Sequence, residues 1–219
     1  MSYIFIKFVT KIIKNMILNI ENQILNKIKK AKRGTLFFTE NFINIGSPDA
    51  IRKALERLVK NQALERVAAG MYVRPEIDPY IGKVPPNIEA IAEAIAKRDG
   101  ARIVPTGVYA LNRLGLSTQV PMNVIYLTDG SARKVNIDNR NIVFKRVSPK
   151  NVATVGEISG LVIQALRTIG KENVREDEII KIQELLKKEK PTRLAYDIRL
   201  APSWIRAIMQ PILKQPINE

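Results

Sequence analysis

The chain has 219 residues, enough for one large domain or two small ones, and its 46% hydrophobic and 26% charged residues are typical of a folded globular protein. It holds no cysteine and no histidine, which excludes disulfides, thiolate nucleophiles, imidazole acid–base chemistry and zinc sites built from those side chains. Its 36 lysines and arginines stand against 21 acidic residues, a net charge of +15 that favours a polyanionic partner, above all nucleic acid.

The first twenty residues form an apolar stretch that lysines interrupt, and their apolar side chains recur at helical spacing as far as Ile28. The lysines argue against a membrane span, and no small-residue cleavage site indicates a signal peptide. Two interpretations stay open for residues 1–15: an amphipathic extension, or an untranslated segment ahead of a true start at Met16. Under either, the sequence predicts a cytoplasmic protein that does not associate with a membrane.

The segment from 21 to 75 is predicted to form a series of short elements. In chain order they are a helix over 21–32, a strand over 35–39, a short helix over 40–44, a long helix over 47–62 and a hairpin over 63–75. Gly34 and Gly46 interrupt the series, and Thr39 is placed to cap the short helix.

The helix over 47–62 has two distinct faces. Ser47 is placed as its N-cap, Pro48 fits the first helical position, and Asp49 lies near the positive end of the helix dipole. The apolar face consists of Ile51, Ala54, Leu55, Leu58 and Val59. The polar face consists of Arg52, Lys53, Glu56, Arg57 and Lys60. Four of those five polar residues are basic, so the helix is either a solvated surface helix or a surface that recognises a polyanion.

Prolines mark a boundary over 75–87, and a second set of elements follows. These are a helix over 88–98, a strand over 102–105, a helix over 107–117, strand runs over 123–128, 132–137 and 141–147, and helices over 155–170, 176–188 and 203–214. We expect the three strand runs to form an antiparallel meander, and Pro191 and Pro202 to separate the last helical pieces.

Together the elements predict an α+β protein. It would have an N-terminal winged helix-turn-helix domain, then a mixed α+β domain with a small antiparallel sheet and C-terminal helices. The expected limits are an extension over 1–20, a DNA-binding domain over 21–78, a proline-rich linker over 79–87 and an α+β effector domain over 88–219.

Double-stranded DNA is the partner that this order favours, because the second helix of the turn enters the major groove while the wing touches the backbone beside it. Arg52 and Arg57 can read guanine edges, whereas Lys53 and Lys60 can hold phosphates. Further backbone contacts are assigned to Ser47 at the helix start, to Arg66 and Arg74 beside the wing, and to the cluster Lys29, Lys30, Lys32 and Arg33.

Two stretches of the sequence resemble a known family. FFTENFINIGSPDAIRKALERLVKNQALERVAAGMYVRP looks like the N-terminal winged helix of AbiEi-type antitoxins from type IV toxin–antitoxin systems, and GVYALNRLGLSTQVPMNVIYLTDG is similar to a second domain found in a related subgroup. The matching positions in the recognition helix and wing are Arg52, Lys53, Arg57, Lys60, Arg66 and Arg74.

The resemblance implies a cytoplasmic bacterial antitoxin that represses its own operon by binding an inverted repeat, which would bring two copies onto the DNA. It also implies antagonism of a nucleotidyltransferase-like toxin encoded beside it, without stable contact between the two proteins.

Two other classes of function remain as alternatives. A winged helix without an antitoxin role would act as a transcription regulator, or as an interaction module that docks an acidic protein on the same basic surface. For an enzyme, the nearest candidates are Asp129, Asp138 and Glu157, which lie near predicted loops, but turn chemistry explains the two aspartates. We therefore predict no catalytic residue, no metal and no cofactor. Four basic residues on the predicted strands either extend the DNA surface or form solvated strand faces, the interpretation that we favour: Arg133, Lys134, Lys145 and Arg146.

Overall fold

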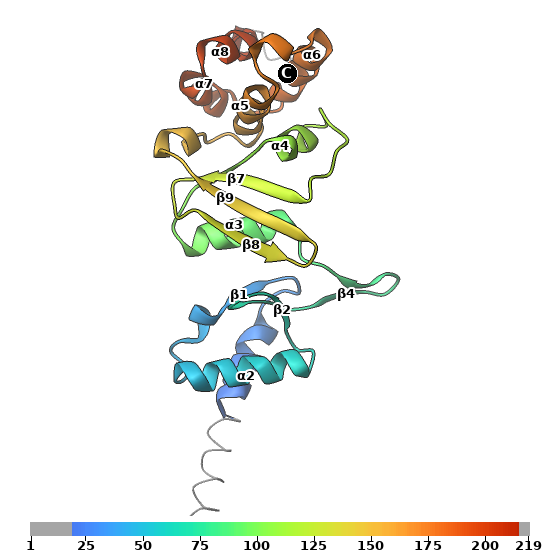
Figure 1. The fold of residues 1–219 in the computed structure, drawn as a ribbon, viewed down its shortest axis with the longest axis vertical. Coiled ribbons are helices and arrows are strands. Elements are labelled where there is room, and N and C mark those ends of the chain that lie inside the picture. Colours follow the sequence, from blue (N-terminus) through green and yellow to red (C-terminus); the bar gives the residue numbers. More distant parts are fainter. Residues whose placement is uncertain (1–18, 215–219) are drawn as a thin grey trace, which may run out of the picture. The chain divides into compact units, whose positions relative to one another are not determined.

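The computed structural model describes residues 19–214, and these form two compact units (Figure 1). The division falls between Ile91 and Ala92, inside helix α3 (Ile88–Arg98). The sequence had suggested an earlier boundary, at the prolines of 79–87. Most of the predicted N-terminal extension, with its alternative start at Met16, lies outside the described residues.

Residues 19–30 of the first unit form a helix, called here the first helix. The elements after it are β1 (Leu36–Phe38), the 3-10 helix η1 (Thr39–Phe42), α2 (Pro48–Lys60), β2 (Glu65–Ala68), β3 (Met71–Val73), β4 (Glu76–Asp78) and β5 (Gly82–Val84). β3 pairs antiparallel with both β1 and β2, so the order in this three-stranded sheet is β1-β3-β2. Gly70, with a φ of +67°, makes the tight turn between β2 and β3.

The core of this unit follows from helical spacing in two segments. Ile24 and Ile28 are fully or almost fully buried on the first helix, and the predicted apolar face of α2 packs against them through Ile51 and Leu55. Each such side chain stabilises the fold by roughly 1.5–3 kcal/mol relative to exposure. Gly46 permits a close approach here, because a Cβ at this position would lie 2.8 Å from Cδ1 of an isoleucine on the first helix.

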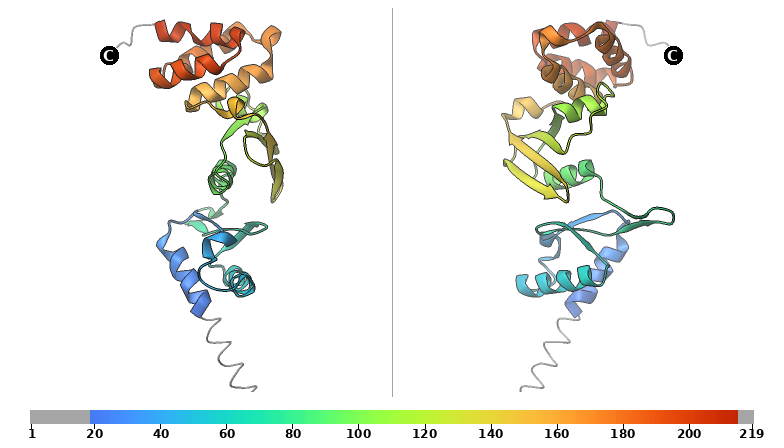
Figure 2. Two further views of the ribbon diagram at one scale, coloured as in Figure 1. Left: turned by 90° about the vertical axis from the view of Figure 1, so that its left-hand side faces the viewer. Right: turned by 45° about the vertical axis from the view of Figure 1, so that its right-hand side comes forward.

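The predicted linker is not simply an extended connection. β4 and β5 pair antiparallel in a separate two-stranded sheet, which occupies part of the range 79–87 and extends away from the three-stranded sheet (Figure 2). Asp78 accepts hydrogen bonds from the backbone amides of Tyr80 and Ile81, at 2.8 and 3.1 Å, and so closes the turn between the strands.

The second unit contains a four-stranded mixed sheet. Its strands are β6 (Ile103–Thr106), β7 (Asn123–Thr128), β8 (Arg133–Ile137) and β9 (Arg140–Arg146), in the order β6-β7-β9-β8. The expected antiparallel meander is wrong, because β7 runs parallel to β9 and does not pair with β8. The four residues between β7 and β8 are enough to carry the chain past β9, which lies between these two strands in the sheet. An extended residue spans roughly 3.3 Å, and neighbouring strands lie roughly 4.8 Å apart.

Helices complete the second unit. They are α4 (Val108–Arg113), η2 (Pro149–Val152), α5 (Glu157–Ile169), η3 (Lys171–Asn173), α6 (Glu176–Leu186), α7 (Pro191–Leu200), α8 (Ser203–Met209) and α9 (Pro211–Lys214). α7 was not predicted: Pro191 is its first residue rather than a separator. The fold is thus mixed α+β, with small sheets followed by C-terminal helices, and no helix among residues 19–214 is long and apolar enough to cross a membrane.

Two buried carboxylates hold the start of α5. Asp197 is fully buried and accepts bonds from the amides of Val155 and Gly156, both at 2.9 Å, and from the hydroxyl of Ser159 at 2.5 Å. Glu189 accepts from the amide of Ser159 at 3.3 Å. Together they supply partners for amides that the helix itself leaves free.

Tyr126 lies in the interior of the second unit, 2% exposed, with its ring centroid 6.0 Å from that of Tyr109. Burial raises the pKa of the Tyr126 phenol well above its ordinary value, and the nearby Tyr109 phenol raises it further. Tyr126 therefore stays neutral in the folded protein at pH values where an exposed tyrosine ionises.

Candidate nucleic-acid interface

α2 begins as its sequence predicts. Ser47 is the N-cap, its hydroxyl accepts a bond from the amide of Ala50 at 3.4 Å, and Pro48 occupies the first turn. At the other end Gln62 takes a left-handed φ of +58°, and the amide of Ala63 bonds the carbonyl of Leu58 at 2.9 Å. Both ends of the helix are therefore fixed by residues of its own segment.

Lys53 and Lys60 lie on the outward face of α2. They are seven residues apart, two turns of helix, and both are exposed. Neither makes a hydrogen bond or ion pair with any residue in the described part of the chain. Their charges are thus uncompensated locally, as a phosphate-binding role requires.

Arg52 lies on the flank of α2 that faces the sheet, between two carboxylates. Its Nη1 is 2.9 Å from Oε1 of Glu56, and its Nη2 is 3.7 Å from Oδ1 of Asp49. All three side chains are more than half exposed. Arg52 is therefore oriented within its own helix and remains accessible to a ligand.

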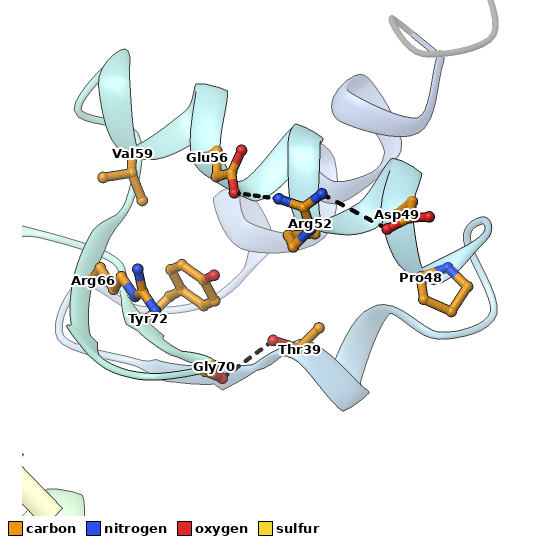
Figure 3. Close-up of a pocket in the computed structure, with 9 residues that line it drawn as sticks. All are labelled: Thr39, Pro48, Asp49, Arg52, Glu56, Val59, Arg66, Gly70 and Tyr72. Carbon is orange, nitrogen blue, oxygen red and sulfur yellow. Dashed lines mark hydrogen bonds and ion pairs between the residues drawn. The ribbon is translucent and has the colours of Figure 1, made fainter.

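A groove of about 470 Å³ separates this flank of α2 from the β2–β3 hairpin (Figure 3). Its lining residues are Thr39, Pro48, Asp49, Arg52, Glu56, Val59, Arg66, Gly70 and Tyr72. Thr39, predicted as a helix cap, instead begins η1, and its hydroxyl donates to the Gly70 carbonyl at 3.4 Å. The groove thus brings together residues from η1, α2 and the β2–β3 hairpin.

Arg57 does not lie with Arg52. Its Nε is 2.6 Å from Oε2 of Glu21, on the first helix, and the Glu21 side chain is only 14% exposed. The Arg57 Nη2 atom is itself buried. Arg57 therefore links α2 to the first helix, and the base-reading role expected from the sequence does not fit this geometry.

Arg74 also has a structural role in place of the predicted DNA contact. Its Nη1 donates to the carbonyl of Lys29, at 3.0 Å, and to that of Ala31. Both carbonyls lie at the C-terminal end of the first helix, where the helix itself supplies no amide donors and a cation is favourable. Arg66, in contrast, is exposed on β2 directly opposite Tyr72, and it lines the groove.

Lys32 and Arg33 are exposed in the turn that precedes β1, with no ion pair to another described residue. Lys29 and Lys30 are exposed at the end of the first helix. None of the four lines the groove. The predicted site is therefore divided: Ser47, Arg52, Lys53, Lys60 and Arg66 lie on α2 or along the groove, whereas Arg57 and Arg74 stabilise the unit.

Sequence comparison identifies the family. Residues 23–194 match a family described as a family of unknown function, DUF6088. This chain belongs to the DUF6088 family. The matched range contains every element of the groove. No curated protein matches this DUF6088 chain.

One solved structure similar to the DUF6088 chain is that of the RV2827C protein from Mycobacterium tuberculosis. The two sequences are 12% identical, the alignment covers 91% of this chain and 82% of that protein, and the TM-score is 0.45.

Proposed function

We propose that this DUF6088 protein binds double-stranded DNA, with residues 19–74 acting as a winged helix. The observation that carries the proposal is the pair of exposed lysines on the outward face of α2, Lys53 and Lys60, beside a groove that presents Arg52 and Arg66. Neither lysine has an ion pair among residues 19–214. Two positive charges at this spacing along one helix face suit phosphates on either side of a DNA groove.

The order and pairing of the elements support this proposal. A helix, a strand, a short helical turn, a long basic helix and a hairpin follow one another, and the hairpin pairs with the first strand in a three-stranded antiparallel sheet. In a winged helix the same order places the long helix in the major groove and the hairpin against the backbone. Here η1 takes the place of the helix before the turn.

Each exposed residue then has a chemical role. Lys53 and Lys60 hold phosphates, Arg52 reads a base edge from the groove flank of α2, and Arg66 contacts the backbone from the hairpin. The hydroxyl of Ser47 and the free amides of the first turn of α2 lie at the positive helix end, which favours a further phosphate. The acidic side chains that line the groove, Asp49 and Glu56, repel phosphates and so oppose non-specific DNA binding there.

The biological role we propose is that of an antitoxin that represses its own operon. The resemblance of residues 37–75 and 107–130 to AbiEi-type antitoxins supports this part of the proposal. It gives an inverted repeat upstream of the gene as the DNA target, bound by two copies of the chain, and a neighbouring nucleotidyltransferase-like toxin as the protein that the antitoxin counteracts.

Binding of the purified chain to its own upstream DNA, compared with random DNA of equal length, tests the proposal. We expect tighter binding to the upstream DNA, and loss of affinity for both DNAs when Lys53 and Lys60 are replaced by alanine. Each phosphate contact is worth roughly eightfold in affinity at about 0.1 M salt, so the double variant should lose well over tenfold.

The matched control replaces two exposed lysines of the second unit, Lys150 and Lys188, by alanine, which removes the same charge from outside the site. We expect that variant to retain its affinity within about threefold. Equal losses in both double variants would mean that net charge alone binds DNA. Absence of DNA binding, together with capture of an acidic protein partner through Lys53 and Lys60, would instead favour an interaction module.

A further inference from the structure

We propose that Glu56 determines sequence discrimination at this DNA site, by holding Arg52 in one orientation over the groove and by repelling phosphate from it. The inference rests on the proposed DNA-binding function. It assigns to an acidic residue of the recognition helix a positioning role that the basic composition of the unit does not suggest.

The geometry supports the positioning role. Arg52 and Glu56 are one helical turn apart, and their side chains meet over the groove, with Asp49 on the opposite side of the guanidinium (Figure 3). Glu56 accepts a hydrogen bond from Nη1 of Arg52, and Asp49 forms an ion pair with Nη2. A guanidinium carries five N–H groups in a plane, so four remain for a base edge while the plane itself is held.

Orientation matters because a free arginine side chain loses much rotamer freedom when it binds. An arginine already held in place loses less, and it can satisfy the bidentate pattern of one base better than that of another. An unheld arginine would instead turn to the nearest phosphate. Glu56 thereby keeps Arg52 directed towards base edges.

The charge of Glu56 acts in the same direction. Arg52 and Arg66 both line the groove and would attract a phosphate into it, while Glu56 and Asp49 line the same groove with negative charge. Random DNA is bound in many registers, in most of which Arg52 has no matching base. The repulsion between the two carboxylates and the DNA phosphates is then not offset by a base contact of Arg52. Discrimination of this kind comes from penalising the wrong ligand as well as from rewarding the right one.

The pair contributes little to folding, because its members are 56% and 57% exposed. Glu56→Gln should therefore fold as the wild type does. The control is Glu65→Gln on β2. Glu65 is adjacent to Arg66 but does not line the groove, and its ion pair is with Lys83 at 3.6 Å. Both substitutions remove one negative charge from the same unit.

The experiment measures dissociation constants of wild type, Glu56→Gln and Glu65→Gln for the upstream DNA and for random DNA of equal length. We expect Glu56→Gln to tighten random-DNA binding by about threefold or more and to leave upstream binding unchanged or weaker, so that the ratio of the two affinities falls by about threefold or more. Glu65→Gln should change both affinities by the same small factor.

A double-mutant cycle separates positioning from simple charge. In an Arg52→Ala background, Glu56→Gln should lower the affinity for upstream DNA relative to random DNA by less than it does in the wild type, because only the phosphate repulsion remains and there is no arginine left to orient. An unchanged ratio in Glu56→Gln, or the same change with and without Arg52, would overturn the inference while leaving DNA binding intact. A wild-type chain that binds neither DNA would overturn the proposed function itself.

Discussion

Replacing Arg57 with alanine should destabilise the first unit without abolishing DNA recognition. The substitution removes the 2.6 Å bond to Glu21 and leaves that carboxylate, 14% exposed, without its cation. Exposed ion pairs contribute about 0.2–1 kcal/mol, and breaking a fully buried pair costs about 3–5 kcal/mol. Because Arg57 is 38% exposed, this pair lies between those limits, and we expect a loss of about 2 kcal/mol in the free energy of unfolding.

Hydrogen exchange of peptides from residues 19–74 measures this loss directly. Tryptophan fluorescence would not, because the one tryptophan, Trp204, lies in the second unit. The double variant Glu21→Ala/Arg57→Ala should recover part of the stability, since it leaves no unpaired charge. At a temperature where Arg57→Ala is folded, its DNA affinity should stay within about threefold of wild type. If Arg57→Ala were as stable as the wild type but bound upstream DNA more than tenfold more weakly, the structural role of Arg57 would be refuted. A role in reading bases would then be favoured for Arg57.

Two further predictions concern the second unit. Asp197→Ala removes an acceptor of three hydrogen bonds at the start of α5 and should lower the free energy of unfolding by about 3 kcal/mol or more. The loss is measured by urea titration, followed through the fluorescence of Trp204, which packs against the core of the same unit. A loss below about 1 kcal/mol would contradict the capping role of Asp197. Burial raises the pKa of Tyr126, so its contribution to stability is present below the unfolded pKa of about 10 and is lost as pH rises above that value. Tyr126→Phe should therefore shift alkaline unfolding to higher pH, and an unmoved midpoint would contradict this assignment.

Local signals in the sequence were sufficient for the elements around α2. Ser47 and Pro48 identify the helix start because a cap and a first-turn proline act within three residues. The spacing of Ile51, Leu55 and Leu58 identifies the buried face, since helical period alone decides which side chains share a side. Gly70 similarly marks the hairpin turn.

Partners distant in the chain could not be predicted in the same way. Arg57 and Arg52 look alike in sequence, five residues apart on one polar face. Only the packing of the first helix decides that Arg57 meets Glu21, 36 residues earlier, while Arg52 faces the groove. Arg74 likewise finds carbonyls more than 40 residues away. Such long-range contacts leave no periodic pattern in the sequence.

The prediction of strand pairing in the second unit was wrong for a related reason. The turn residues Asp129 and Gly130 indicate where β7 ends, but a turn signal does not say whether the next strand pairs beside it or one position further across the sheet. The parallel pairing of β7 with β9 depends on which strands bury their apolar side chains together. Pro191 was also ambiguous, because a proline both ends helices and begins them.

The salt dependence of binding tests the central claim most directly. The affinities of wild type and of Lys53→Ala/Lys60→Ala for the upstream DNA are measured over a range of salt concentrations, and log K is plotted against log salt concentration. If both lysines of α2 hold phosphates, the slope for the double variant is shallower by about two. A double variant whose slope and affinity equal those of the wild type would contradict the account, because α2 would then not face DNA.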